Sequence, residues 1–430
     1  MARLDDPRFA PDCEITFDHR RVPARAGESV AAALLAAGRA LVARSPKYHR
    51  PRGPFCLAGS CGSCLARIDG QPNRRTCRVP CRPGLSVESQ NTILGADHDL
   101  LAVVDRIYAR GLDHHTLMTG SRLANRAAIA VSRQLAGLGK LPAAPPAPSP
   151  PAVEERFDAV VVGAGPAGLG AAEALAAAGR RVLLVDDAPV AGGRLRARLG
   201  LPGDPPGAWV AEVLQAVHRA GGEVALASAA AGFWRDGGPL LGVLVDAAPP
   251  RLRAIRAGSI VLATGTHPQP PDLDDGDLPG VFAARGLLAL HAEHGVIPGA
   301  SAAVLAENRG DEEEAEAVVV RLAAAGVPVR RVEGARAARG TRRVAALLLD
   351  GGGEVACDTV AVTGRGLPAA DLARLAGARL RPDAFAHFEL SADGLTLAPG
   401  VLGAGELLGP RSAREAADEG RRAGEAAARG

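Results

Sequence analysis

Four cysteines in the N-terminal part constrain the fold of this chain more strongly than any other feature. Cys56, Cys61, Cys64 and Cys77 have the spacing C-x4-C-x2-C-x12-C. Four thiolates brought together in this order can hold one [2Fe–2S] cluster, with two cysteines on each iron. The first three lie in a loop rich in glycine and serine, whose backbone N–H groups can turn toward the cluster sulfides. We therefore predict that these four residues are the metal ligands of a [2Fe–2S] cluster.

Two other uses of the four cysteines remain as alternatives. A structural zinc site is the first, although zinc ribbons usually pair two C-x2-C knuckles and this quartet contains one. Disulfide bonds are the second, but no apolar run of a secretion signal follows the first residues. Cys81 lies four residues after Cys77 and is a candidate spare ligand, although a buried structural thiol is its commoner role.

Composition excludes several functional classes. At 430 residues the chain has room for several domains, each with its own core. Its net charge of +3 is close to neutral for this size, which argues against a nucleic-acid-binding surface. The alanine-rich stretch at residues 30–42 is interrupted by Arg39 and is too short to cross a bilayer. We expect a cytoplasmic protein with no nucleic-acid partner and no membrane span.

The residues around the cysteines predict a β-grasp domain that covers residues 1–98. Residues 15–25 alternate in polarity around a tight centre and indicate a β-hairpin. An apolar helix is expected from Ser29 to Gly38, which is the residue type that commonly ends a helix. Together with the strands on either side of the turn near Gly70, these elements form a wall beneath an exposed cluster loop.

Residues 99–151 are expected to connect two domains. The apolar spacing at the start of this segment favours helix. Two adjacent histidines, His114 and His115, point to different helix faces, so a surface pair is favoured over a metal site. Residues 141–151 are rich in proline and predict a stiff, extended linker. This linker is the clearest domain boundary in the chain.

A dinucleotide-binding fingerprint follows the linker. An apolar strand runs directly into G-x-G-x-x-G at Gly163, Gly165 and Gly168, and an alanine-rich helix continues from it. The glycines allow the tight turn and the close approach of a pyrophosphate, which the helix N-terminus binds. The next strand ends at Asp186, where a carboxylate would accept the ribose hydroxyls and repel the 2′-phosphate of NADP. We therefore predict a bound adenine dinucleotide other than NADP.

A second strand–helix–strand set lies at residues 299–362 and has no such fingerprint. The turn that would carry it, residues 306–313, contains one glycine. It also contains four acidic residues, Glu307, Asp311, Glu312 and Glu313, which would repel phosphate. We therefore do not expect a working nicotinamide site there.

With these residues in place, the part from Phe157 onward resembles the two-dinucleotide-domain fold of the FAD-dependent pyridine-nucleotide oxidoreductases. The whole chain is similar to the large subunits of multi-subunit amine and amino-acid oxidases. That family includes the opine oxidase A subunit, the hydrogen cyanide synthase A and B subunits, and the sarcosine oxidase alpha subunit. The predicted fold is therefore an α+β β-grasp [2Fe–2S] domain followed by an α/β, Rossmann-like flavoprotein. The resemblance implies an FAD domain at 152–285 plus 364–430 and an inserted, degenerate second dinucleotide domain at 286–363.

The resemblance also implies the residues that would bind the dinucleotide. They are Gly163, Gly165, Pro166, Ala167, Gly168, Asp186, Asp187, Gly193, Arg194, Ala263, Thr264, Gly265, Gly405 and Glu406. Two departures from the family pattern are present. Glu406 replaces the aspartate that family members use on the flavin ribityl chain, and no C-x2-C follows Phe157, which excludes a disulfide-reductase site of the thioredoxin reductase kind.

The function that this resemblance implies is electron transfer within an amine or amino-acid dehydrogenase. A partner subunit similar to the D-amino-acid and glycine oxidases would oxidise the substrate, and this chain would pass electrons through a flavin and the cluster to an acceptor. No catalytic acid or base is predicted, and His267 is interpreted as a pocket wall. The cofactors are then a [2Fe–2S] cluster and FAD, with FMN at a subunit interface as a further candidate.

Two other functional classes remain open. The chain could be a self-sufficient NADH:acceptor reductase, which the acidic turn at 306–313 disfavours. It could also be a scaffold that holds NAD, ATP or FAD without turnover while only the cluster is redox-active. A fingerprint recognises the adenine half of its ligand, so it does not distinguish FAD from NAD or ATP.

Overall fold

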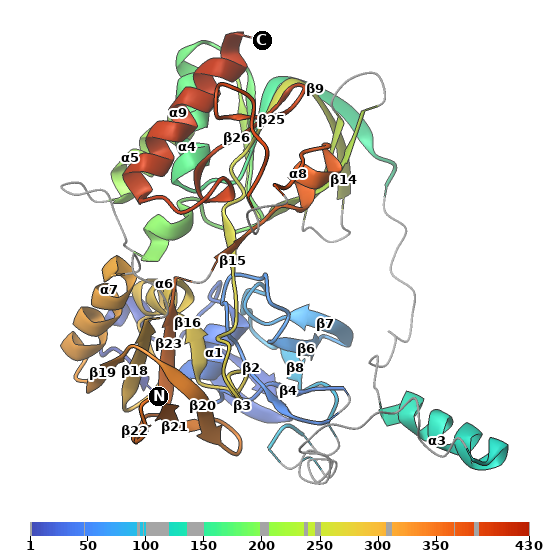
Figure 1. Cartoon of the computed structure of the whole chain (residues 1–430), viewed down its shortest axis with the longest axis vertical. Coiled ribbons are helices and arrows are strands. Elements are labelled where there is room, and N and C mark those ends of the chain that lie inside the picture. Colours follow the sequence, from blue (N-terminus) through green and yellow to red (C-terminus); the bar gives the residue numbers. More distant parts are fainter. Residues whose placement is uncertain are drawn as a thin grey trace. The chain divides into compact units, whose positions relative to one another are not determined.

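The computed structural model describes residues 2–46, 48–92, 95–97, 99, 120–135, 150–197, 206–235, 240–245, 251–306, 312–364, 366–381 and 387–429. Those residues form two compact units, each drawn in Figure 1. The first unit is Met1–Pro145 with Gln269–Arg365, and the second is Pro146–Pro268 with Gly366–Gly430. His114, His115, most of the proline-rich linker and the turn at 307–311 lie outside the described residues.

A five-stranded sheet with one helix forms the N-terminal domain of the first unit. Its strand order is β3-β2-β8-β6-β7, in which β2 and β8 are parallel and the other pairs are antiparallel. The elements are β2 (Cys13–Phe17), β3 (Arg20–Ala24), β6 (Leu65–Ile68), β7 (Gln71–Arg75), β8 (Ser86–Glu88) and α1 (Val30–Ala36). The predicted hairpin and helix are thus confirmed, as is the β-grasp class.

Local sequence explains where the hairpin turns and where α1 begins. Asp18 and His19 both have positive φ, 46° and 66°, as the twisted two-residue turn of a hairpin requires. The Ser29 side chain accepts a hydrogen bond from the Ala32 backbone N–H and caps α1. Burial of Ile15 and Leu34, each at most 1 % exposed, holds α1 against the sheet.

A parallel sheet flanked by two helices forms the rest of the first unit. Its strand order is β16-β23-β18-β19, beside a smaller antiparallel sheet, β20-β21-β22. The elements are β16 (Val281–Ala283), α6 (Ala284–His294), β18 (Ala302–Ala306), α7 (Glu312–Ala324), β19 (Val329–Val332), β20 (Ala335–Gly340), β21 (Val344–Leu349), β22 (Glu354–Ala356) and β23 (Thr359–Thr363). The short strand β1 (Ala2–Arg3) pairs with β17 (Val296–Ile297) and joins the two parts of this unit.

An eight-stranded sheet is the centre of the second unit. Its main path is β11-β10-β9-β14-β13-β12, and β26 extends it from β14. The strands are β9 (Val153–Val162), β10 (Val182–Val185), β11 (Glu223–Ala225), β12 (Ser228–Trp234), β13 (Leu240–Val245), β14 (Arg251–Leu262), β25 (Thr396–Ala398) and β26 (Val401–Gly403). The parallel strands β11, β10, β9, β14 and β26 have the arrangement expected of a dinucleotide-binding fold.

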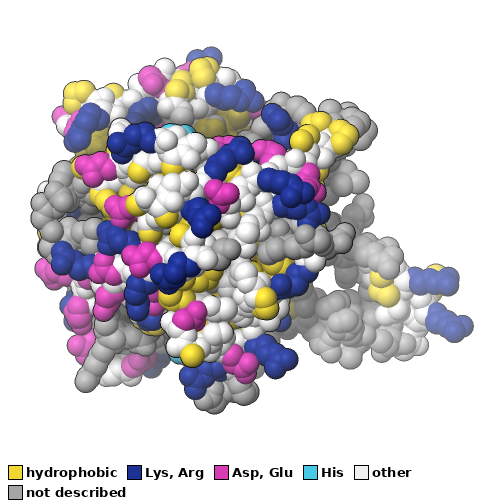
Figure 2. Space-filling view, turned by 90° about the horizontal axis from the view of Figure 1, so that it is seen from above, with side chains coloured by type: hydrophobic (Ala, Val, Ile, Leu, Met, Phe, Trp, Pro, Cys, Tyr) yellow, Lys and Arg dark blue, Asp and Glu magenta, His cyan; other side chains and the backbone are white. Residues whose placement is uncertain are grey.

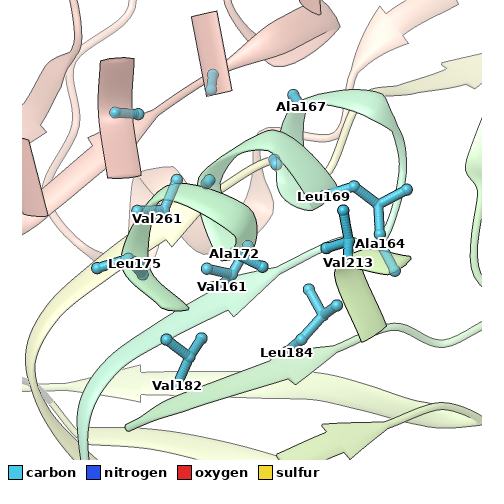
Figure 3. Packing of buried hydrophobic residues seen from close by; sticks show 14 of the residues in the cluster. Val161, Ala164, Ala167, Leu169, Ala172, Leu175, Val182, Leu184, Val213 and Val261 are labelled. Carbon is cyan, nitrogen blue, oxygen red and sulfur yellow. The ribbon is translucent and has the colours of Figure 1, made fainter. Parts of the chain in front are cut away.

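Three helices cover one face of this sheet, namely α4 (Pro166–Ala177), α5 (Pro206–Arg219) and α9 (Ala413–Arg429). Figure 3 shows the apolar side chains between them, with Val161 and Leu184 of the sheet facing Ala172 and Leu175 of α4. The helices α4 and α9 pack so closely that a Cβ at Gly420 would overlap the Ala167 carbonyl oxygen, so this position requires glycine. The other face packs against α8 (Asp371–Leu375).

The remaining described elements are short or lie at the edges of the two units. They are η1 (Pro7–Phe9), β4 (Ala43–Arg44), β5 (Pro51–Arg52), α3 (Arg122–Leu135), η3 (Gly193–Ala197), β15 (Thr266–Pro268), β24 (Gly366–Pro368) and η4 (Gly405–Leu407). Among the helices that the structure describes, none is both long and apolar enough to cross a membrane.

Candidate iron–sulfur and dinucleotide sites

The structure brings the thiols of the four predicted metal ligands into contact with one another. Cys56, Cys61 and Cys64 lie in the loop that leads into β6, and Cys77 follows β7. The Sγ atoms of Cys64 and Cys77 are 3.5 Å apart, and the thiol of Cys56 contacts those of Cys61 and Cys77. Two thiolates on one tetrahedral metal with bonds of about 2.3 Å lie about 3.8 Å apart. The spacing of Cys64 and Cys77 therefore suits two ligands of one iron.

Backbone N–H groups surround the first ligand. The N–H groups of Ala58 and Cys61 each donate to Cys56 Sγ, at 3.4 Å. The loop can turn these groups inward because Leu57, Gly59 and Gly62 have positive φ. Contacts with the Cys61 and Cys77 thiols, together with this N–H donation, hold the pKa of Cys56 well below its usual range. A lowered pKa favours the thiolate, which is the form that binds iron.

The arrangement of the four cysteines can be compared with the two alternative uses, a structural zinc site and disulfide bonds. In the described part of the chain, no group of three or more histidine, cysteine, aspartate or glutamate side chains surrounds a single ion position. A zinc ion and a two-iron cluster each take four cysteine ligands, and the C-x4-C-x2-C-x12-C spacing is the feature that favours the cluster. All seven cysteines are free thiols. Four thiols in contact with one another fit the four ligands of a [2Fe–2S] cluster.

Two buried hydroxyl groups lie beside the ligands and are not among the predicted site residues. Ser60 Oγ and Thr76 Oγ1 have no nitrogen or oxygen partner, and they interact with the thiols of Cys56 and Cys64 respectively. Hydrogen bonds to cluster sulfurs raise the reduction potential, so both hydroxyls fit a role in tuning the cluster. Each of these residues directly precedes a ligand cysteine in the sequence, and this position could have marked them as candidate site residues.

Helix α6 supports the cluster loop from within the first unit. The Ala283 N–H donates to the Phe55 carbonyl oxygen at 3.1 Å, immediately before the first ligand. Phe55 and Cys56 are buried in the apolar core that includes Val281 and Ala283. A Cβ at Gly286, on the first turn of α6, would overlap the Cys56 carbonyl oxygen. Only glycine therefore allows α6 to approach this closely.

We expect Gly286→Ala to reduce the iron content of the purified protein and to lower its stability by about 1–3 kcal/mol. The added methyl group meets backbone rather than a flexible side chain, so the loop that carries Cys56 must move. Iron analysis and thermal unfolding measure the two effects. Gly207→Ala is the matched control, because Gly207 lies in α5 with no atom within 4 Å of the added Cβ. Equal iron content in both variants would contradict the supporting role of α6.

The predicted dinucleotide residues meet around the N-terminus of α4 in the second unit. Gly163 has φ 105°, and a Cβ there would overlap the Ala263 carbonyl oxygen. A Cβ at Gly168 would overlap the Gly163 carbonyl oxygen, so these two glycines hold the turn closed. Gly165 differs, because the nearest atom to its added Cβ is 3.9 Å away, on Gly193. Gly165 thus borders open space at the helix N-terminus, where a pyrophosphate would bind.

Asp186 lies at the end of β10, beside the same turn. Its carboxylate accepts hydrogen bonds from the Ala164 N–H at 2.5 Å and from the Ala188 N–H at 2.7 Å. A carboxylate at the end of this strand is the acceptor that a dinucleotide-binding fold uses for the ribose hydroxyls. Asp187, the next residue, is exposed. Thr264 Oγ1 donates to the Ala369 carbonyl oxygen at 2.9 Å, which fixes the chain that follows β14.

The C-terminal landmark turn packs against the start of α4. The Cβ of an alanine at Gly405, where φ is 74°, would meet Ala167 Cβ at 2.7 Å. The Glu406 carboxylate forms an ion pair with Arg194, at 3.2 Å, and both side chains are largely buried. Arg194, another predicted dinucleotide residue, therefore holds the Glu406 carboxylate in place. Glu406 stands where the resemblance implies an aspartate that binds the flavin ribityl chain.

Glu419 orders this turn and is not among the predicted site residues. Its buried carboxylate accepts a hydrogen bond from the Gly405 N–H at 2.7 Å and pairs with Arg411 at 3.3 Å. Glu419 belongs to α9, so its contact with the turn depends on how α9 packs. The run of charged residues in that helix predicts a solvated face, and the sequence carries no signal that singles out this member.

The described part of the second dinucleotide-like subdomain is acidic where phosphate would bind. Glu312, Glu313 and Glu314 form the first turn of α7. Glu314 is buried, pairs with Arg285 and accepts a hydrogen bond from the Gly364 N–H at 3.3 Å. These carboxylates occupy the helix N-terminus that phosphate uses in a working site. His267, in β15, is exposed.

A β-grasp domain with a cysteine quartet, joined to a dinucleotide-binding fold, defines an iron–sulfur flavoprotein oxidoreductase. Residues 11–92 match the family described as 2Fe-2S iron-sulfur cluster binding domain. Residues 157–293 match the family described as pyridine nucleotide-disulphide oxidoreductase, whose fold binds FAD. The predicted fold class and the predicted cofactors, a [2Fe–2S] cluster and FAD, are thereby supported at the level of domains.

Relatives of known name extend this result over most of the chain. The chain is 32% identical to the sarcosine oxidase alpha subunit of Rhizobium meliloti over 346 residues, which are 76% of this chain and 34% of that protein. It is 34% identical to the opine oxidase A subunit of the same organism over 33% of this chain and 32% of that protein. The hydrogen cyanide synthase subunit HcnA of Pseudomonas aeruginosa is 39% identical over 20% of this chain and 81% of that protein. The chain belongs to the family of oxidoreductase subunits that includes these relatives, and it spans about a third of the length of the sarcosine oxidase relative.

A solved structure supports the fold over nearly the whole chain. The L-proline dehydrogenase from P. horikoshii superposes with a TM-score of 0.75, at 20% sequence identity, over 98% of this chain and 74% of that chain. At this level of identity the likeness concerns the fold alone.

Proposed function

We propose that this chain is the electron-transfer subunit of a hetero-oligomeric, flavin-dependent amine or amino-acid dehydrogenase. The observation that carries this proposal is that one polypeptide has both a quartet of contacting cysteines and a dinucleotide fingerprint with open space at Gly165. When bound, a flavin accepts two electrons and releases them singly, and a [2Fe–2S] cluster carries one at a time. The relatives are named as oxidase or synthase subunits, which supports a multi-subunit setting.

The residues of this chain have binding roles in that proposal. Cys56, Cys61, Cys64 and Cys77 would hold the cluster, and Ser60 with Thr76 would donate to its sulfur ligands. The turn from Gly163 to Gly168 would hold the pyrophosphate of FAD at the N-terminus of α4, with Asp186 on the adenosine ribose. The remaining predicted residues, from Gly193 to Glu406, would line the flavin side of the same site.

Substrate oxidation is assigned to a partner subunit similar to the D-amino-acid and glycine oxidases. His267 is exposed on β15, so its setting gives no support to a proton-transfer role. Oxidation of a C–N bond with release of two electrons then takes place on the partner, and FMN at the subunit interface is a candidate link. We propose that the protein is cytoplasmic, since cysteines that hold a cluster have to stay reduced.

Reduction by NADH separates this proposal from a self-sufficient NADH reductase. Mixed anaerobically with NADH, the isolated chain is expected to keep its visible absorption, because acidic side chains occupy the N-terminus of α7. The complex purified from its native cells is expected to lose absorption with an amine such as sarcosine or proline. Rapid bleaching of the isolated chain by NADH would establish the reductase instead. Reduction of the cluster by the amine, without reduction of any nucleotide bound to this chain, would favour the scaffold function.

A further inference from the structure

The chain around the cysteine quartet is cationic. Residues 53–79 carry four arginines and one acidic residue, Asp69. Asp69 lies at the turn between β6 and β7 and is paired with Arg82. On the face of the molecule drawn in Figure 2, Lys and Arg side chains are interspersed with Asp and Glu. The segment that carries the cluster ligands therefore has a net positive charge within a nearly neutral chain.

Arg75 lies next to ligands on two sides. It is the last residue of β7, two residues before Cys77, and its Cα pairs with that of Leu65, which follows Cys64. A separation of two residues places the Arg75 and Cys77 Cα atoms within about 7 Å of each other. Exposed charges interact over about 8 Å at physiological ionic strength. Arg75 is exposed, so its charge acts on molecules that approach the cluster from solvent.

Arg78 lies across the cluster loop itself. Its Nη2 donates to the Ala58 carbonyl oxygen at 2.8 Å, within the loop that carries the first three ligands. A Cβ at Gly59 would overlap the Arg78 side chain, so the guanidinium group lies directly over that glycine. Ala58 is exposed, and Cys61 is half-buried beside it. The part of the loop nearest to solvent is thus bordered by a second positive charge.

We propose that Arg75 and Arg78, which we call the arginine rim, form the docking surface for a one-electron acceptor whose surface is acidic around its own redox group. This inference rests on the proposed function, in which electrons leave this subunit through the cluster. In the transfer, one electron leaves the reduced cluster and reduces one acceptor by one electron. A cationic rim raises the local concentration of an anionic partner and orients it, and it disfavours a cationic one.

Two small oxidants of opposite charge test whether the arginine rim acts as a positively charged surface. The full-length protein with its reduced cluster is mixed with hexacyanoferrate(III), charge −3, or with hexaamminecobalt(III), charge +3. Added salt is expected to slow oxidation by the anion and to speed oxidation by the cation, because screening weakens attraction and repulsion alike. The ratio of the two rates is the quantity compared between variants, since a change in cluster potential affects both rates in the same direction.

Arg75→Glu and Arg20→Glu form a matched pair. Arg20 is also exposed, but it lies on β3, at the opposite edge of the same five-stranded sheet. Four strand spacings of about 4.8 Å separate the two edges by about 19 Å, well beyond the screening length. Among the described residues, neither arginine has a carboxylate partner. At low ionic strength Arg75→Glu is expected to lower the anion-to-cation rate ratio by about five-fold or more, and Arg20→Glu to leave it nearly unchanged.

A binding measurement without electron transfer completes the test. Hexacyanochromate(III) has the charge of hexacyanoferrate(III) and does not take the electron, and its paramagnetism broadens backbone NMR signals near its binding site. Broadening is expected around β7 in the wild type and in Arg20→Glu, and its loss is expected in Arg75→Glu. Equal behaviour of the two variants, or faster oxidation by the cation at low salt, would overturn the docking surface. A cluster that reacts with neither oxidant would overturn the proposed function itself.

Discussion

Replacement of Cys56 by serine is expected to remove the iron–sulfur cluster and to leave the dinucleotide site loaded. Cys56 is 1 % exposed, and two backbone N–H groups are already directed at its Sγ atom. Serine has no thiolate to offer, so one iron would lose half of its protein ligands. Iron content is expected to fall from about two atoms per chain to nearly none. Iron analysis and the EPR spectrum of the reduced protein measure this loss.

Cys357→Ser is the matched control for that substitution. Cys357 is also a buried free thiol, 2 % exposed, in the same apolar core as Cys56. It follows β22 and is not a predicted ligand, so its serine variant is expected to keep both iron atoms. A Cys56→Ser protein with full iron content would contradict the assignment of the quartet. Loss of iron in Cys357→Ser alone would mean that the ligand set had been misassigned.

Gly165→Ala is expected to empty the dinucleotide site without unfolding the protein. The added Cβ meets nothing closer than 3.9 Å in the protein, so the fold has room for it. It enters the space at the N-terminus of α4, where the pyrophosphate would lie against backbone. Bound nucleotide per chain is expected to fall at least ten-fold, which corresponds to about 1.4 kcal/mol or more of lost binding free energy. Chromatography of the released nucleotide measures the effect.

Gly168→Ala separates this effect from damage to the fold. Its Cβ would overlap the Gly163 carbonyl oxygen, so this variant is expected to lose both nucleotide and thermal stability. Gly165→Ala should keep its far-UV circular dichroism, its iron content and the thermal stability of the nucleotide-free wild type. Full nucleotide content in Gly165→Ala would show that the ligand does not lie against this turn.

Features that are determined by short stretches of sequence were predictable. The hairpin that contains Asp18, the helix that begins after Ser29 and the strand that leads into Gly163 each follow from local spacing and are confirmed. The turn at Gly163 and Gly168 follows for the same reason, because each glycine is required by a backbone contact within the fingerprint or with the adjacent strand. The residue list of the dinucleotide site remains a prediction, although its members lie together.

Features that depend on distant parts of the chain were not predictable. The support of Cys56 by Gly286 joins residues more than 200 positions apart, and no local pattern marks it. The ion pair between Arg194 and Glu406 spans 212 positions, and the hydrogen bond from Gly405 to Glu419 requires the packing of α9 on α4. In each case the contact is determined by how helices pack on sheets, which a single sequence does not encode locally.

Cofactor analysis of the anaerobically purified chain decides whether one polypeptide carries both redox groups. The protein is unfolded, the released nucleotide is identified by chromatography and mass, and iron and sulfide are counted in the same sample. About one FAD and two irons per chain are expected, since the chain has one intact fingerprint and one cysteine quartet. Recovery of NAD, ATP or no nucleotide beside two irons would contradict a flavin-to-cluster path within this chain and would assign the flavin to the partner or to the interface.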